Sequence, residues 1–285
     1  MSKLADAKRE PFATHPTIGR CDAEATRVVH VGDVAFGGSE FVVIAGPCAV
    51  ESREQIEDIA RSMAKHHAKV LRGGAFKPRT NPHTFRGLGF EGVELLRRAS
   101  VKSGLPFVTE VLSPADVGEL GPRVDAFQVG ARNMQNFALL DELGRQSKPV
   151  LLKRGFGATL SEWLHAAEYV AQGGNTEIIL CERGIRSFGG ETRFVLDLAG
   201  ALWAKQHCVL PVVIDPSHAT GDPALVAPLT RAAAAAGLDG VMVEVHPDPS
   251  VALSDGGQAL MVDEFATLMS SLRLVCEAVE RPLAS

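Results

Sequence analysis

The chain has 285 residues, of which 46% are hydrophobic and 22% charged, and this composition is ordinary for a soluble globular protein. The formal net charge of −5 argues against general nucleic-acid binding, although it leaves room for a local basic pocket. No apolar run is long enough to span a bilayer, and the first residues lack the apolar core of a signal peptide. We therefore expect a cytoplasmic protein that binds neither nucleic acid nor membrane.

The N-terminal segment, residues 1–38, is polar and irregular apart from an alternating apolar pattern over residues 28–38, which predicts a short hairpin. A segment of this length is too short for an independent fold. We therefore interpret residues 1–38 as an extension without a built-in regulatory domain, and residues 39–285 as the catalytic domain.

From residue 41 onward, short apolar runs rich in β-formers alternate with helical patterns. The apolar runs are residues 41–46, 69–74, 106–111, 126–131, 149–155, 177–184, 211–217 and 240–246. The clearest helical patterns are residues 52–68, 84–104 and 159–174, and the alanine run 232–236 predicts a further helix that ends at Gly237.

Eight strands that alternate with helices predict an α/β fold of the (β/α)8 (TIM) barrel type. The runs are almost continuously apolar, as expected of strands buried on both faces. A doubly wound open sheet is the competing fold, but no G-x-G-x-x-G motif follows the first strand.

In such a barrel the catalytic groups lie at the C-terminal ends of the strands. In chain order these ends carry Cys48; Arg72, Lys77 and Arg79; Glu110; Arg132; Lys153 and Arg154; Glu182, Arg183 and Arg186; Asp215 and His218; and Glu244 and His246. So many cations at one end of an acidic protein indicate a substrate set with more than one anionic group. We interpret Arg154 and Arg186 as salt-bridge partners at the rim.

A second constellation combines Cys48, His218, Glu244 and Asp255, which come from the first, seventh and eighth strands and the loop after the eighth. These strands become neighbours when the barrel closes, so the four side chains can converge. Mixed sulfur, nitrogen and oxygen donors suit a divalent ion such as Mn, Fe, Co or Zn. Spacing alone leaves Cys48 open as an ordinary core cysteine.

Seven motifs appear in order and carry a family resemblance. They are GPCAVES (46–52), LRGGAFKPRT (71–80), QVGARNMQN (128–136), LLKRG (151–155), IILCERG (178–184), DPSHATG (215–221) and VEVHPDP (243–249). Over about residues 30–275 the chain resembles the type I 3-deoxy-D-arabino-heptulosonate 7-phosphate (DAHP) synthases. That subfamily is related to the 3-deoxy-D-manno-octulosonate 8-phosphate synthases.

The resemblance implies a transferase that condenses phosphoenolpyruvate with erythrose 4-phosphate and water, giving DAHP and phosphate at the start of the shikimate pathway to aromatic compounds. It also implies a homo-oligomer, either a dimer or a tetramer. The implied phosphoenolpyruvate ligands are Arg72, Lys77, Arg132, Lys153 and Arg183, and the implied aldose-phosphate ligands are Pro78, Arg79 and Thr80. The implied metal ligands are Cys48, His218, Glu244 and Asp255.

The chemistry implied by the family assigns catalytic roles to Lys77, Glu110 and His218. The metal held by His218 acts as a Lewis acid on the aldehyde oxygen, and C3 of phosphoenolpyruvate attacks the aldehyde carbon. We expect Lys77 to protonate the new alkoxide and to have a lowered pKa because it lies among cations. Water then adds at C2 and phosphate leaves by C–O cleavage. Glu110 either orients that water or pairs with a rim cation.

The substrate loop reads KPRT and continues Asn81-Pro82-His83, where the family often has Ser-Pro-Tyr. The KPRT sequence favours the four-carbon aldose, because octulosonate synthases carry a different loop. An octulosonate synthase or a synthase for a variant aldose remains the alternative, and a catalytically silent barrel with a regulatory role is the third hypothesis.

Overall fold

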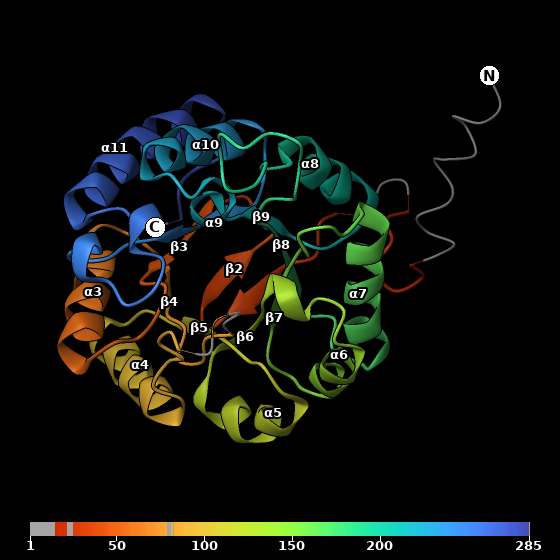
Figure 1. Ribbon diagram of the computed structural model, residues 1–285. Coiled ribbons are helices and arrows are strands. Elements are labelled where there is room, and N and C mark those ends of the chain that lie inside the picture. The colour runs from red at the N-terminus through yellow and green to blue at the C-terminus, as the bar shows by residue number, and fades with distance from the viewer. Residues whose placement is uncertain (1–14, 22–24, 79–80, 82, 285) are drawn as a thin grey trace.

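The computed structural model describes residues 15–21, 25–78, 81 and 83–284. Eight parallel strands close into a barrel, and helices surround it (Figure 1). Around the barrel the strand order is β10-β3-β4-β5-β6-β7-β8-β9, so the last strand pairs with the first. The predicted (β/α)8 barrel is therefore confirmed.

Each predicted apolar run contains one barrel strand. The strands are β3 (Val42–Gly46), β4 (Val70–Arg72), β5 (Phe107–Glu110), β6 (Ala126–Val129), β7 (Val150–Lys153), β8 (Ile178–Glu182), β9 (Val212–Ile214) and β10 (Gly240–Glu244). Every residue of these strands is buried, because one side of the sheet faces the barrel interior and the other faces the helices.

The helices follow the strands in the expected alternation. They are α3 (Arg53–Lys65), α4 (Phe90–Ser103), α5 (Pro114–Leu120), α6 (Phe137–Gly144), α7 (Leu160–Gln172), α8 (Leu198–His207), α9 (Pro216–Thr220), α10 (Pro223–Ala235) and α11 (Val262–Ala278). Short 3₁₀ turns lie at Gly121–Arg123, Ala131–Asn133, Pro249–Val251 and Gly256–Gln258.

Local sequence sets where these helices begin and end. Helix α7 begins at a capping box, in which Thr159 and Glu162 satisfy each other's backbone N–H groups. Helix α4 begins six residues later than the pattern from residue 84 predicted. Gly87 and Gly89 stand in the left-handed region, with φ of 91° and 62°, so the helix cannot start before them.

The predicted hairpin is present as β1 (Val29–Val31) and β2 (Val34–Phe36), and Figure 1 shows β2 in line with the centre of the barrel. Val29, Val31 and Phe36 are buried in one cluster with the inward-facing side chains of the barrel strands. A side chain at Gly32 would collide with Pro106, at the start of β5. The hairpin therefore closes the N-terminal end of the barrel, which we call the floor.

The residues before the hairpin attach to the outer helices. The backbone N–H groups of Thr17 and Ile18 donate to the buried Glu168 carboxylate of α7, and Gly19 forms a bridge with Cys208 at the end of α8. Among the described residues, no helix is both long and apolar enough to cross a membrane. The opposite end of the barrel, where the strands terminate, is called the mouth.

Candidate active site

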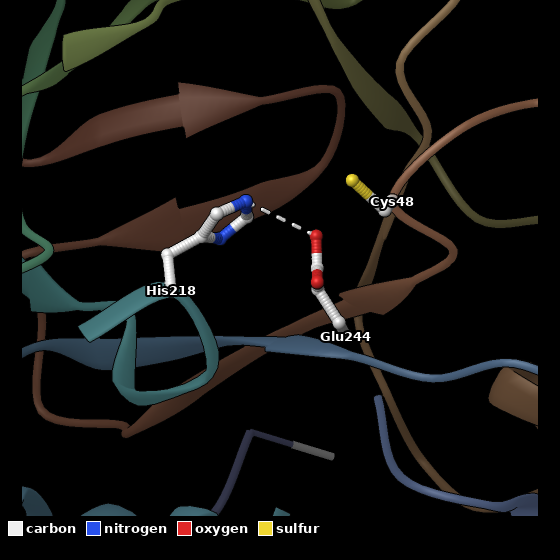
Figure 2. Close-up of side chains that lie close together, drawn as sticks. All are labelled: Cys48, His218 and Glu244. Atoms are coloured by element: carbon white, nitrogen blue, oxygen red, sulfur yellow. Dashed lines mark ion pairs between the residues drawn. The ribbon is translucent and has the colours of Figure 1, made fainter. Parts of the chain in front are cut away.

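At the mouth, side chains from neighbouring strands bring a sulfur, a nitrogen and an oxygen donor together. Donor atoms of Cys48, His218 and Glu244 all lie within 4.8 Å of one another, and Figure 2 shows the three side chains converging. Asp255 lies next to them, with its Oδ2 3.1 Å from Cys48 Sγ. The structure thus brings together all four residues of the predicted metal site, because β9, β10 and β3 are adjacent in the barrel.

His218 is oriented by Asp215, the last residue before α9. The buried Asp215 carboxylate caps that helix by accepting from His218 N and also contacts His218 Nδ1 at 2.7 Å. His218 Nε2 is thereby directed to Glu244 Oε1, 3.2 Å away. Lys153 Nζ lies 2.5 Å from the same Asp215 carboxylate. A carboxylate behind a histidine in this way fixes the ring orientation of a metal ligand.

Glu244 is held by two further side chains. Arg72 donates to its Oε1 at 2.7 Å, and Gln258 donates to its Oε2 at 2.6 Å. Gln258 in turn accepts from Arg193 at 2.9 Å. Sequence reasoning missed Gln258 and Arg193, since neither lies at a strand end. The loops around residues 193 and 258 return toward the barrel axis, and this path, which the sequence does not show, places both side chains at the site.

Burial controls the protonation of this cluster. Burial, with a contribution from Glu244, raises the pKa of the Cys48 thiol to about 12. Burial also lowers the pKa of His218 to about 4, despite its acidic neighbours. The site therefore presents a neutral imidazole and a thiol, which a divalent ion converts to a thiolate on binding. Donor types, proximity and orientation all fit a divalent transition ion.

Beside this cluster lies a cavity of about 230 Å³. Among the described residues, six cationic side chains line its walls: Arg72, Lys77, Arg132, Lys153, Arg183 and Arg193. Glu110, His218 and Asp255 also line it, so the metal cluster and the cations face one space. All five cations that the sequence assigned to phosphoenolpyruvate are gathered here.

Lys77 lies at the junction between the cavity and the metal cluster. Its Nζ donates to Cys48 Sγ at 2.9 Å and to the Cys48 carbonyl oxygen at 3.0 Å. Burial alone would lower the pKa of Lys77, but its interactions with Cys48 and Glu110 outweigh burial and raise it. The expected lowered pKa is therefore wrong, because Lys77 interacts with Cys48 and Glu110 as well as with the neighbouring cation Arg72.

Glu110 faces the same cavity from the end of β5. Burial raises its pKa, although Lys77 and Lys153 partly oppose this effect. Its closest hydrogen-bond partner is Gln128 Nε2, 3.4 Å from Oε2. A side chain at Gly130 would place Cβ 2.0 Å from Glu110 Oε1, so the glycine makes room for this carboxyl group. Among the described residues no ion pair is found for Glu110, which leaves its water-orienting role as a prediction.

The two arginines predicted to form salt bridges at the rim behave differently. Arg154 forms the predicted ion pairs, with Glu182 at 3.0 Å and Asp197 at 2.8 Å. Arg186 forms none within the part of the chain that the structure describes, and its guanidinium lies 5.8 Å from the Phe156 ring centroid instead. The salt-bridge interpretation of Arg186 therefore stays a prediction.

Only part of the predicted aldose site lies within the residues that the structure describes. Pro78 lines the cavity together with Asn81 and Thr84. Arg79, Thr80 and Pro82 lie outside the described residues. His246, at the end of β10, contacts Glu51 at 3.4 Å and so joins two loops at the rim.

A family model matches most of the chain. Residues 21–280 match the model of the DAHP synthetase I family. The chain belongs to that family. The matched range includes every barrel strand and all the site residues named above.

Two proteins illustrate the sequence similarity of this DAHP synthetase I family member to its relatives. The phospho-2-dehydro-3-deoxyheptonate aldolase of Thermotoga maritima is 48% identical over 252 residues, which span 88% of this chain and 75% of that protein. The 2-dehydro-3-deoxyphosphooctonate aldolase of Syntrophotalea carbinolica is 33% identical over 264 residues, spanning 86% of this chain and 94% of that protein.

Two solved structures of DAHP synthase superpose closely on this chain. The crystal structure of the Thermotoga maritima DAHP synthase superposes with a TM-score of 0.90 at 46% identity, covering 94% of this chain and 78% of that one. A truncated form of the DAHP synthase from the same organism superposes with a TM-score of 0.88 at 43% identity, covering 95% of this chain and all of that one.

Proposed function

We propose that the chain condenses phosphoenolpyruvate with erythrose 4-phosphate and water to give DAHP and phosphate, the first step toward aromatic compounds. The observation that carries the proposal is the shared space: a cavity lined by six cations opens onto a buried Cys-His-Glu cluster. Two phosphorylated substrates need many cations, and an aldehyde needs an electrophilic activator.

The cations serve binding. Lys153 and Arg183 are buried, and both line the cavity, so they bind an anion in an environment of weak screening. We assign them, with Arg72, Lys77 and Arg132, to the carboxylate and phosphate of phosphoenolpyruvate. Arg79 and Thr80, with Pro78, are assigned to the aldose phosphate.

Cys48, His218, Glu244 and Asp255 would hold the divalent ion. When bound, such an ion supplies Lewis acidity toward the aldehyde oxygen of the aldose. We propose Mn, Fe, Co or Zn for it, since these ions accept mixed sulfur, nitrogen and oxygen donors.

Two residues of the chain handle protons. C3 of phosphoenolpyruvate forms the new bond to the aldehyde carbon, and the resulting alkoxide takes a proton from Lys77. The raised pKa of Lys77 keeps that proton in place until the alkoxide forms. Glu110 orients the water that adds at C2 and accepts one of its protons. The hydroxyl proton of the resulting hemiketal passes to the phosphate, which leaves with its bridging oxygen as C2 becomes the ketone, and the cations stabilise the charge on the departing group.

Product identification tests this proposal. Protein loaded with Mn²⁺ is incubated with phosphoenolpyruvate and erythrose 4-phosphate, and the products are identified by mass and by released phosphate. We expect one phosphate for each phosphoenolpyruvate consumed, with a seven-carbon keto acid phosphate as the other product. Unconsumed phosphoenolpyruvate, in protein shown to be folded and loaded, would reject the proposal.

An octulosonate synthase is the second candidate, since relatives named 2-dehydro-3-deoxyphosphooctonate aldolase align with 30–33% identity. The KPRT loop and the 48% identical relative named as a heptonate aldolase favour the four-carbon aldose. The same assay with arabinose 5-phosphate separates the two candidates. We also propose that the protein is a homo-oligomer, a dimer or a tetramer, which sedimentation velocity would measure.

A further inference from the structure

Two phenylalanine rings stand at the mouth, outside the apolar core. Phe156 follows β7, and Phe194 lies between β8 and α8. Their rings are stacked, with centroids 5.1 Å apart and planes within 7°. In the described parts of the chain, neither ring belongs to the two hydrophobic clusters, and Phe156 lines the cavity. Core packing therefore does not explain their position.

Their principal neighbours are guanidinium groups. The guanidinium carbon lies 4.9 Å from the Phe156 centroid for Arg183, 5.3 Å for Arg132 and 5.8 Å for Arg186. For Phe194 the corresponding distances are 4.5 Å for Arg183 and 5.6 Å for Arg193. The faces of an aromatic ring carry negative potential and attract cations, most often arginine. The stacked pair thus gathers four arginines that would otherwise repel one another.

Arg183 contacts both rings and is the most constrained of the four. One of its nitrogens donates to the His218 carbonyl oxygen at 3.3 Å, while Nη1 is buried and has no hydrogen-bond partner among the described residues. An arginine that packs against aromatic rings keeps its N–H groups available for hydrogen bonds. A buried cation with a free N–H group is suited to an anionic ligand.

Backbone contacts hold the two rings in place. Phe194 N donates to Ala219 O at 2.7 Å, and Arg186 N donates to Phe156 O at 2.8 Å. Ile185 and Val195 form an antiparallel bridge that returns the chain to the barrel. Gly184 has a φ of 94°, and a side chain there would lie 2.6 Å from Phe194 Cβ. The rings are therefore positioned by the fold itself and not by the ligand.

We propose that Phe156 and Phe194 are positioning residues that fix the guanidinium edges of Arg132 and Arg183 for the phosphate of phosphoenolpyruvate. This inference rests on the proposed function. It assigns the rings no contact with the reacting atoms, so their loss should weaken binding of one substrate and leave the chemical step almost unchanged.

The test compares leucine and tyrosine variants. Phe156→Leu and Phe194→Leu keep apolar bulk but remove the ring, whereas Phe156→Tyr keeps it. Phe137→Leu on α6 is the control, because Phe137 also contacts a ring, that of Tyr169, but does not line the cavity. KM for each substrate and kcat are measured, and the Kd of phosphoenolpyruvate is determined by calorimetry.

Removing either ring should raise KM and Kd for phosphoenolpyruvate about threefold to tenfold, as expected for the loss of cation–π contacts. KM for erythrose 4-phosphate and kcat should stay within about twofold, and Phe156→Tyr should behave like the unmodified protein. Equal losses for both substrates, or a tyrosine variant as impaired as the leucine variant, would overturn the inference.

Should Phe194→Leu fail to fold, Phe156→Leu decides the matter, since the half-buried Phe156 ring faces the cavity. Two further results separate this inference from the proposed function. If the unmodified protein binds and consumes phosphoenolpyruvate and both leucine variants bind it equally well, only the inference fails. If the unmodified protein neither binds nor consumes it, the proposed function fails as well.

Discussion

The two ends of the barrel are both buried, but they are built from opposite chemistry. The floor is closed by Val29, Val31 and Phe36 of the hairpin, which pack against the apolar interior of the barrel. The mouth buries charged side chains, among them Lys153 and Glu244, in ion pairs and hydrogen bonds. Apolar burial stabilises a fold directly, whereas burial of charge costs free energy that pairing only partly returns.

The difference shows where stability and function reside. A barrel optimised for stability alone would fill its mouth with apolar side chains, as its floor does. Substitutions at the mouth should therefore reduce activity more than stability, and substitutions at the floor should do the reverse. Each prediction below compares these two ends or refines what the mouth contains.

The largest effect is expected for Cys48→Ala. Loss of the sulfur ligand should reduce kcat about a thousandfold, since Lewis-acid activation supplies several kcal/mol. Chelator should abolish the activity of the unmodified protein, and Mn, Co or Fe should restore it. Cys208→Ala is the matched control, because Cys208 is equally buried but lies at the end of α8. Full activity of metal-free Cys48→Ala protein would remove the basis for the metal site.

At the floor, Phe36→Ala should lower the free energy of unfolding by about 3–5 kcal/mol, the usual cost of emptying a buried phenylalanine site. The fully exposed Phe188 provides the control, and Phe188→Ala should change stability by less than about 0.5 kcal/mol. Urea denaturation measures both variants. A Phe36→Ala protein with unchanged stability but reduced kcat/KM at a temperature where it is folded would contradict the division between the two ends.

Arg183→Ala should reduce kcat/KM for phosphoenolpyruvate about 30-fold or more, because a buried anion loses a charged partner. From the sequence, Arg79→Ala should mainly weaken erythrose 4-phosphate binding. The exposed Arg145, which pairs with Glu142 on α6, is the control site for Arg→Ala exchange. Steady-state kinetics with each substrate varied in turn make the measurement. Both KM values rising equally in both variants would show that the two phosphate sites are wrongly assigned.

Gln258→Leu should weaken metal binding about tenfold, since Glu244 loses a hydrogen bond that fixes its orientation. Titration with Co²⁺, followed by absorbance, measures the affinity without requiring turnover. Gln172→Leu, at an exposed position of α7, should leave the affinity unchanged. Unchanged Co²⁺ affinity in Gln258→Leu would limit Gln258 to a structural contact.

The smallest effect concerns pH and the N-terminal segment. His165 of α7 stacks on His15 with centroids 4.4 Å apart, and burial together with His15 lowers its pKa. The unfolded chain then binds the proton more readily, so this contribution to stability is present above the ordinary histidine pKa and is lost as pH falls from there through the lowered pKa of the folded protein. Unfolding measured at pH values of about 5 and 8 should show a smaller difference in His165→Gln than in the unmodified protein. An identical difference would exclude His165 as the source.

Much of the fold could be predicted because it depends on short-range pattern. The eight apolar runs identify the strands, and the capping sequence at Thr159 marks the start of α7. The start of α4 was predicted too early, since a helical pattern of apolar residues does not report the backbone angles of Gly87 and Gly89. The closure of the floor by the hairpin depends on contacts between distant residues, which no local pattern contains.

The site could be predicted only where it follows strand ends. Cys48, His218 and Glu244 converge because strand order alone makes their strands neighbours. Arg193 and Gln258 lie inside loops, so their position depends on how each loop returns across the mouth. The pKa of Lys77 was misjudged for a related reason, because strand ends reveal nearby cations but not the 2.9 Å contact with Cys48.

Competition kinetics with two aldoses test the central claim most directly. Metal-loaded protein, with phosphoenolpyruvate in excess, is given erythrose 4-phosphate and arabinose 5-phosphate together, and both products are quantified by mass. In the proposed function, a metal ion held by Cys48, His218, Glu244 and Asp255 and the KPRT loop would fix the two ends of the aldose, so a chain one carbon longer would bend or lose one contact, at a cost in alignment of the reacting carbon. The account predicts a higher kcat/KM for erythrose 4-phosphate. A higher kcat/KM for arabinose 5-phosphate would contradict it and make the protein an octulosonate synthase.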